Sequence, residues 1–138
     1  MRGGSKKLST VISCIDYRFW PQALPLLQSK YGDFDLIEIA GASKNLTSPL
    51  EPEDKMTLLE NIGISIKLHH PQKIILVNHL DCGAYGGSES FHSEDEEIKF
   101  HRNELEKAKE IIWEKFPALI VQTELLVIDD KGKVKIYE

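Results

Sequence analysis

Apolar and polar residues follow two periodicities along the chain, one typical of strands and the other of helices. Five short segments are apolar and rich in β-branched residues, and they predict strands at residues 8–13, 34–40, 73–78, 119–128 and 134–137. Three longer segments carry apolar residues at spacings of three and four. They predict helices at residues 20–31, at residues 53–70 and after the capping box that Ser93 and Glu96 form.

The predicted elements alternate as strand, helix, strand, helix, strand, helix, and end on two consecutive strands. This order predicts an α/β fold: a single domain over residues 1–138, with a mainly parallel β-sheet, an antiparallel edge strand and helices on both faces. The uninterrupted apolar run at residues 74–77 is typical of a central strand covered on both sides. Ligands of such sheets bind at the carboxyl ends of the strands, so we expect the site in loops 14–18, 41–42 and 79–87.

The remaining polar and helical positions give further expectations. Residues 43–53 predict a loop, and the apolar residues of helix 53–70 predict one buried face, made of Met56, Leu59, Ile62, Ile66 and Leu68. Several polar residues receive no functional role, and helix-end or surface positions are expected for them: Asp81, His69, His70, His92 and His101.

Composition and charge narrow the class of protein. The 138 residues include 17 Lys and Arg against 22 Asp and Glu, a net charge of −5, which offers no basic field for nucleic acid. No apolar run approaches the roughly 20 residues that span a bilayer, so no membrane partner is expected. Residues 1–7 are polar and carry no secretory or transit pattern, which predicts a cytoplasmic protein.

The two cysteines are the first candidates for chemistry. Cys14 follows the first predicted strand, Cys82 follows the third, and His79 comes three residues before Cys82. Two thiolates and one imidazole form the open type of zinc site, in which water completes the tetrahedron. The structural alternative, two buried core thiols beside an ordinary loop histidine, stays open on residue types alone.

The sequence around these residues resembles a known family. Residues 14–18 (Cys-Ile-Asp-Tyr-Arg) and 79–83 (His-Leu-Asp-Cys-Gly) resemble the β-class carbonic anhydrases, whose motifs are Cys-x-Asp-x-Arg and His-x-x-Cys. The resemblance implies reversible hydration of carbon dioxide to bicarbonate by a zinc-bound hydroxide. It implies one Zn²⁺ per subunit on Cys14, His79 and Cys82, and a catalytic dyad of Asp16 and Arg18.

The dyad has a physical reading that agrees with the resemblance. Zinc lowers the pKa of its bound water to about 7, and an acceptor such as Asp16 would orient the remaining proton. Arg18 would hold Asp16 ionised through a bidentate pair. The resemblance offers Asp16 in two states, paired with Arg18 or bound to zinc as a fourth ligand.

The resemblance also suggests where substrate binds. Ala40 and Gly41 are similar to the small-residue segment that borders the family's pocket, and the backbone of Gly83 could approach a small anion such as bicarbonate. Family members commonly carry Arg-Asn just before this segment, where Glu38 and Ile39 stand here. Two alternatives stay open: a zinc hydrolase of carbonyl sulfide or carbon disulfide, which the same zinc hydroxide could attack, and a catalytically silent zinc-binding regulatory module, which the Glu38 departure favours.

The expected assembly is a homodimer or a higher homo-oligomer. The family builds its pocket partly from a neighbouring subunit, and a lone small sheet leaves an edge strand unpaired. Many members wrap an N-terminal helical arm around the partner, whereas the first predicted strand here begins at Leu8. We therefore expect the usual dimer to be altered.

Overall fold

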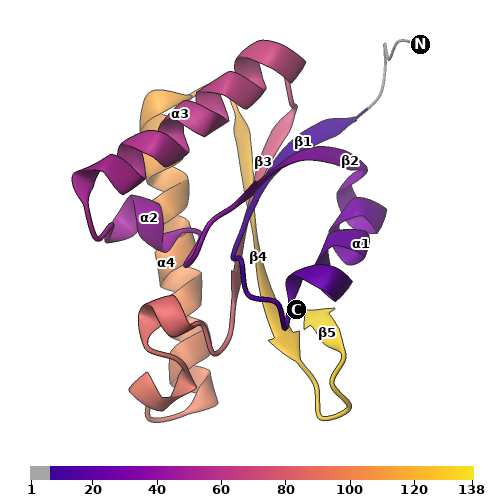
Figure 1. Ribbon diagram of the computed structural model, residues 1–138, viewed down its shortest axis with the longest axis vertical. Coiled ribbons are helices and arrows are strands. Elements are labelled where there is room, and N and C mark those ends of the chain that lie inside the picture. The colour runs from indigo at the N-terminus through magenta and orange to yellow at the C-terminus, as the bar shows by residue number, and fades with distance from the viewer. Residues whose placement is uncertain (1–6) are drawn as a thin grey trace.

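A computed structural model describes residues 7–138 and places them in one sheet with helices on both faces (Figure 1). Residues 1–6, which hold most of the polar N-terminal segment interpreted above, lie outside the described residues. The strands are β1 (Leu8–Ser13), β2 (Asp33–Glu38), β3 (Lys73–His79), β4 (Ile120–Ile128) and β5 (Val134–Ile136). The helices are α1 (Trp20–Tyr31), α2 (Lys44–Thr47), α3 (Pro52–His69), α4 (Glu94–Lys115) and the short 3-10 turns η1 (Gly83–Tyr85) and η2 (Ser88–Ser90).

The five strands lie in the order β2-β1-β3-β4-β5. β1 pairs in parallel with both β2 and β3, β3 pairs in parallel with β4, and β5 runs antiparallel along the end of β4. The predicted α/β fold, with a mainly parallel sheet and an antiparallel edge strand, is confirmed. Because β2 and β3 flank β1 on opposite sides, the strand order reverses at β1, and ligands of such folds bind outside the carboxyl ends of the strands at this point.

Alternating side chains of the central strands supply both cores. On one face, Val11, Ile75 and Val77 pack with residues of α1, and on the other Ile74 and Leu76 pack with residues of α3 and α4. Figure 1 shows α1 alone on its side of the sheet, with α3 and α4 on the other. Residues 74–77 are at most 1% exposed, which confirms β3 as a central strand covered on both faces.

The segment between β2 and α3 differs most from the sequence prediction. Residues 43–53 were expected to form a loop, yet they contain α2, whose Leu46 is buried in the core beside α3 and α4. β2 ends at Glu38, two residues earlier than predicted, because Gly41 and Ala42 take positive φ values of 80° and 42° and turn the chain. A helix of four residues has too little periodicity to be recognised from sequence.

The long helix α4 begins at the predicted cap, although the capping box is only half formed. The Ser93 hydroxyl accepts a hydrogen bond from the Glu96 backbone N–H, but the Glu96 carboxylate accepts from the His92 backbone rather than from that of Ser93.

Within residues 7–138, no helix is both long enough and apolar enough to cross a membrane.

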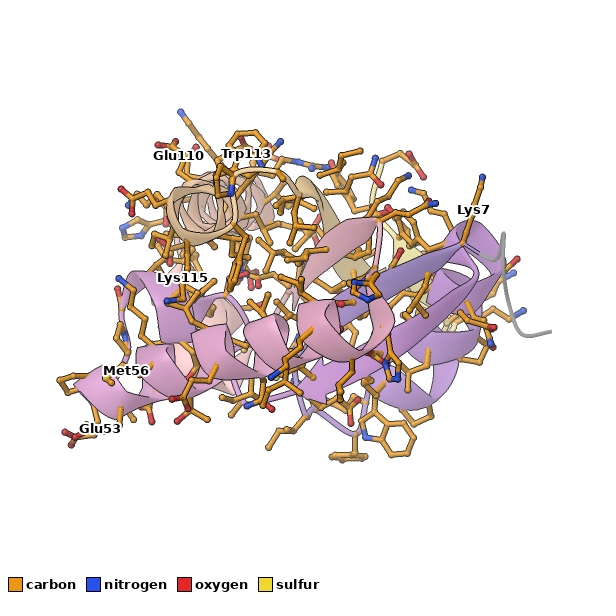
Figure 2. All side chains as sticks on the ribbon, turned by 90° about the horizontal axis from the view of Figure 1, so that it is seen from above. Lys7, Glu53, Met56, Glu110, Trp113 and Lys115 are labelled. Atoms are coloured by element: carbon orange, nitrogen blue, oxygen red, sulfur yellow. The ribbon has the colours of Figure 1, made fainter. Side chains whose placement is uncertain are left out.

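The buried face of α3 is rotated relative to the prediction. Leu58, Ile62 and Ser65 are buried, and Leu59 and Ile66 pack against the core at its margin. Met56 and Leu68 were expected on this face but are 60% and 63% exposed, so that part of the prediction is wrong. Figure 2 shows Met56 on the outer side of its helix.

His101 was expected at the surface or at a helix end, and this is also wrong. It lies in the middle of α4, its side chain is fully buried, and its Nδ1 is 3.1 Å from the Asn78 amide nitrogen. Because both atoms are nitrogens, the amide donates and Nδ1 accepts. Burial lowers the pKa of His101 to about 4, so the ring is neutral at pH 7.

Candidate metal centre

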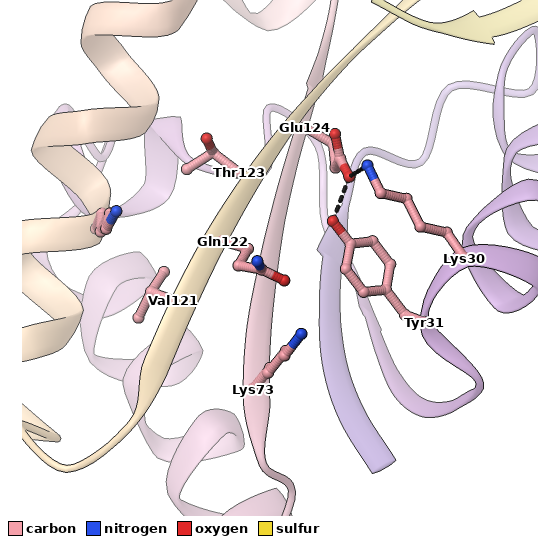
Figure 3. A pocket seen from close by; sticks show the side chains of 8 residues that line it. Lys30, Tyr31, Lys73, Val121, Gln122, Thr123 and Glu124 are labelled. Atoms are coloured by element: carbon pink, nitrogen blue, oxygen red, sulfur yellow. Dashed lines mark hydrogen bonds and ion pairs between the residues drawn. The ribbon is translucent and has the colours of Figure 1, made fainter. Parts of the chain in front are cut away.

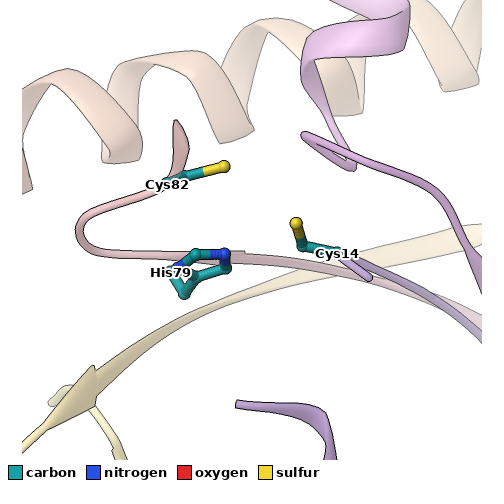
Figure 4. A group of neighbouring side chains, drawn as sticks. All are labelled: Cys14, His79 and Cys82. Atoms are coloured by element: carbon teal, nitrogen blue, oxygen red, sulfur yellow. The ribbon is translucent and has the colours of Figure 1, made fainter. Parts of the chain in front are cut away.

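Three potential metal ligands meet at the carboxyl end of the sheet. Cys14 directly follows β1, and His79 is the last residue of β3, where Ile12 lies opposite Leu76 in the parallel register. Cys82 follows after a tight turn. One ligand atom from each of Cys14, His79 and Cys82 lies within 4.8 Å of the others. Figure 4 shows the three side chains together. All three side chains are at least nine-tenths buried, so the structure brings together the residues that the sequence analysis selected.

The ring of His79 is oriented by its own turn. Its Nδ1 lies 2.7 Å from the Leu80 carbonyl oxygen, which can only accept, so Nδ1 carries the proton and donates. The Phe19 ring stacks on the imidazole with 4.1 Å between centroids. Nε2 therefore presents a lone pair, and this buried nitrogen has no hydrogen-bond partner. An unpartnered buried acceptor beside two sulfurs fits a zinc ligand, because buried polar atoms otherwise find partners.

The two thiols influence each other strongly. The hydrogen bond from Cys82 is the main reason why the pKa of Cys14 falls below its usual value, and the Gly41 backbone N–H, 3.4 Å from the Cys14 sulfur, lowers it further. The same contact with Cys14 raises the pKa of Cys82 above its usual value. A metal that binds both sulfurs as thiolates must displace any proton that they carry.

Asp16 and Arg18 form a close pair beside these ligands. Nε and Nη2 of Arg18 donate to the Asp16 carboxylate at 2.6 to 3.2 Å, and the Arg18 backbone N–H donates to it at 2.9 Å. The Arg18 guanidinium therefore holds the pKa of Asp16 below its usual value. Asp16 Oδ2 is also 3.7 Å from His79 Nε2. Of the two states that the resemblance offered, Asp16 adopts the one paired with Arg18.

The three residues expected to bind substrate, Ala40, Gly41 and Gly83, lie at the same end of the sheet but in different environments. Ala40 lines a cavity of about 310 Å³ together with Ile39 and Ala84. Gly41 is buried and directs its N–H to Cys14, which the sequence analysis did not anticipate. Gly83 begins η1 and is exposed.

A comparison with protein families agrees with this site. The sequence model of the family described as "Putative carbonic anhydrase" matches residues 4–137, which is nearly the whole chain. The protein belongs to this carbonic anhydrase family. The membership is consistent with the Cys-His-Cys group, which is compatible with zinc.

The sequence is also similar to the sequences of two rickettsial proteins. An uncharacterized protein of Rickettsia bellii is 34% identical over 124 residues, which cover 86% of this chain and 76% of the relative. An uncharacterized protein of Rickettsia conorii is 34% identical over 134 residues, 93% of this chain and 71% of the relative.

Solved structures show the fold of this carbonic anhydrase family member in more distant proteins. A tetrameric β-carbonic anhydrase of Sordaria macrospora superposes with a TM-score of 0.62 at 16% identity, over 97% of this chain and 81% of that one. A β-carbonic anhydrase of Trichomonas vaginalis gives 0.59 at 19% identity, over 99% and 86%. The carbonic anhydrase of Streptococcus mutans gives 0.58 at 16% identity, over 96% and 82%. The protein therefore has the β-carbonic anhydrase fold.

Sequence reasoning missed two acidic residues around the carbonic anhydrase-like site. Asp81, expected at the surface without a role, is exposed, but its carboxylate accepts a hydrogen bond from Arg18 Nη1 at 2.9 Å. Glu97, which the sequence analysis did not select, is 2% exposed and accepts a hydrogen bond from the Asp81 backbone N–H at 2.6 Å. The only signal in the sequence was the position of Asp81 between His79 and Cys82.

Gly41→Ala is expected to weaken metal binding about tenfold or more, whereas Gly83→Ala should leave it unchanged. Gly41 has φ of 80°, and an added Cβ would lie 2.9 Å from the Ala84 Cβ, so the turn that delivers its N–H to Cys14 must shift. A Cβ on Gly83 would meet no atom within 4 Å. Competition with a zinc-sensitive dye measures both affinities; equal affinities would contradict a role for Gly41 in shaping the Cys14 site.

A second cavity lies away from this site, along the first half of β4. It measures about 460 Å³ and contains a polar cluster in which Glu124 accepts hydrogen bonds from Lys30, at 2.6 Å, and from the Tyr31 hydroxyl (Figure 3). None of its lining residues is a cysteine or histidine. The buried Glu124 carboxylate is thus paired within the protein. The candidate metal ligands Cys14, His79 and Cys82 lie at the opposite end of the sheet.

Proposed function

We propose that the protein is a zinc-dependent carbonic anhydrase that interconverts carbon dioxide and bicarbonate, with one Zn²⁺ per chain held by Cys14, His79 and Cys82. The observation that carries this proposal is the buried group of Cys14, His79 and Cys82, whose ligand atoms lie within 4.8 Å of one another. Nε2 of His79 has no hydrogen-bond partner, and the Asp16–Arg18 pair lies beside it. Family membership and the β-carbonic anhydrase fold support the same activity.

The proposed roles of the residues follow from their contacts. When bound, zinc supplies an acidified water, with a pKa near 7, as the source of the nucleophile. Asp16 is ionised and 3.7 Å from His79 Nε2, so it is placed to accept a hydrogen bond from a reactant held between the ligands. Arg18 keeps this carboxylate charged and oriented through the bonds it donates.

The substrate pocket is proposed to lie over the turn that follows β2. Ala40 and Ile39 line the cavity of about 310 Å³ there, together with Ala84 of η1. Gly41 contributes mainly through its N–H bond to Cys14, which leaves Ala40 and Gly83 as the small residues proposed to border carbon dioxide or bicarbonate. Their lack of large side chains suits a substrate of three or four heavy atoms.

The working form is proposed to be a homo-oligomer of at least two chains. The β-carbonic anhydrases of Sordaria macrospora, which share this fold, are tetrameric. β2 is an edge strand of the sheet, and apolar side chains stay exposed on it (Leu36) and on α3 (Met56, Ile64 and Leu68). An open edge beside exposed apolar residues favours association. The cytoplasmic location stays a prediction from the sequence.

The proposed activity is tested by stopped-flow hydration of carbon dioxide. Protein loaded with one equivalent of zinc should accelerate hydration far above buffer, and its rate should rise with pH through the neutral to mildly alkaline range as the nucleophile loses its proton. Metal-free protein should show only the buffer rate. Stoichiometric zinc without acceleration would contradict the proposal, and assays with carbonyl sulfide would then test the related hydrolysis.

A further inference from the structure

The guanidinium of Arg18 is held from two sides. Its Nε and Nη2 face Asp16, while Nη1 donates to the Asp81 carboxylate at 2.9 Å and Nη2 donates to the Asp81 backbone carbonyl at 2.8 Å. Asp81 therefore offers a second, two-point acceptor to the same group. Arg18 lies between two carboxylates that are separated by 65 residues in sequence and belong to the loops after β1 and β3.

The backbone of Asp81 is in an unusual conformation that creates this second acceptor. Its φ of 58° places it in the left-handed region, which non-glycine residues rarely adopt and which Asp and Asn tolerate best. The other carboxylate oxygen, Oδ1, accepts from the Ser88 backbone N–H at 2.8 Å. One side chain thus binds both Arg18 and the far end of the loop that carries Cys82.

A buried carboxylate from α4 anchors this turn. Glu97 accepts the Asp81 backbone N–H at 2.6 Å through Oε2 and the Ser88 hydroxyl at 2.8 Å through Oε1. Glu97 is 2% exposed, and a carboxylate in such a place is costly unless donors surround it. Both of its oxygens are used to fix the loop between residues 81 and 88, which favours a single position for Asp81.

We propose that Asp81 is a positioning residue that holds the Arg18 guanidinium in place against Asp16, while Glu97 fixes the turn that carries Asp81. We call this arrangement of Asp81 and Glu97 the brace. Arg18 has a long side chain that is 36% exposed, and its bonds to Asp16 hold the guanidinium from one side only. A second carboxylate opposite the first restricts the guanidinium to the plane in which it faces Asp16. The effect of Asp81 on turnover rests on the proposed function, whereas the brace itself does not.

The brace is tested by Asp81→Asn in the zinc-loaded protein. Asparagine keeps the size of the side chain and tolerates the left-handed backbone, but it replaces one acceptor oxygen by a donor that cannot pair with either Arg18 or the Ser88 N–H. Nuclear magnetic resonance of the Arg18 Nε–H should show hydrogen exchange about tenfold faster than in the original protein. The matched control is Glu89→Gln, which removes one charge from the same loop at an exposed side chain.

The same variants test how the brace acts on turnover. Asp81→Asn should keep its zinc and lower kcat about tenfold with KM little changed, and Glu89→Gln should change neither. In an Arg18→Ala background, Asp81→Asn should cause no further loss, because Asp81 acts through Arg18. An exchange rate of the Arg18 Nε–H that is unchanged in Asp81→Asn would overturn the proposal. An Asp81→Asn substitution that lowers kcat equally in the original protein and in the Arg18→Ala background would also overturn it. If the original protein has no hydration activity, the proposed function fails while the exchange measurement still decides the brace.

Discussion

Replacing Cys82 with alanine is expected to reduce bound zinc from about one ion per chain to less than a tenth and to lower the unfolding temperature. The Cys82 sulfur completes a group whose ligand atoms lie within 4.8 Å of one another, and it belongs to a different loop from Cys14. A metal shared by these loops stabilises the native state only, because no such group is preformed in the unfolded chain. At a thousandfold excess over its dissociation constant, this stabilisation is about 4 kcal/mol, or roughly 10 °C for a domain of this size.

Metal analysis and calorimetry check this prediction with an internal control. The original protein treated with a chelator should unfold close to the temperature of Cys82→Ala with zinc present, because both lack the same ion. Cys14→Ala and His79→Ala should behave in the same way. Full zinc occupancy and unchanged unfolding in Cys82→Ala would mean that the ligands are assigned wrongly.

Asp16→Asn and Arg18→Ala are expected to keep zinc and lose hydration activity by a factor of about a hundred or more, the usual scale of a lost proton acceptor. The asparagine side chain in Asp16→Asn keeps the shape of the aspartate, but only its oxygen can accept hydrogen bonds, because its nitrogen donates them. In Arg18→Ala, the Asp16 carboxylate loses all its side-chain donors and is free to move toward the metal. Stopped-flow rates and zinc content measure the two effects separately.

A matched control for this pair is Asp130→Asn, which removes one carboxylate from an exposed position after β4, far along the chain from the ligands. Its rate and zinc content should equal those of the original protein. Loss of zinc in Arg18→Ala, or near-normal hydration in Asp16→Asn, would show that the pair is a structural salt bridge.

The pH dependence of this pair follows from the direction of its shift. Arg18 holds the pKa of Asp16 below its usual value, so the pair stabilises the fold above the ordinary carboxyl pKa near 4 and loses this contribution as pH falls further. Asp16 consequently stays ionised throughout the neutral range. The activity expected to rise near neutral pH therefore reports the nucleophile and not this carboxyl.

Much of the fold was predictable because periodicity encodes it directly. The bounds of β1 and α1 agree with the prediction, since a β-branched run and a helical apolar pattern meet clear turn residues there. α2 was missed because its formation depends on the burial of Leu46 between α3 and α4, a tertiary contact. The prediction for α3 was wrong in part because Met56 and Leu68 are apolar but lie six residues to either side of Ile62, which at about 3.6 residues per turn turns them away from the buried face.

The site was predictable to the extent that its residues form short motifs. Cys14, His79 and Cys82 end neighbouring parallel strands, and such ends coincide in space. Asp81 and Glu97 were not predictable in the same way. Their contacts depend on a left-handed residue and on where α4 crosses the turn, and neither has a sequence pattern of its own.

X-ray absorption spectroscopy of the zinc-loaded protein tests the central claim, a zinc ion on Cys14, His79 and Cys82 with one position open to the reactant. The account predicts two sulfur neighbours at about 2.3 Å and one imidazole nitrogen at about 2.0 Å, with a fourth light atom completing the shell. Cys82→Ala should remove this spectrum. A zinc shell of only oxygen and nitrogen, or one with a single sulfur, would contradict the account.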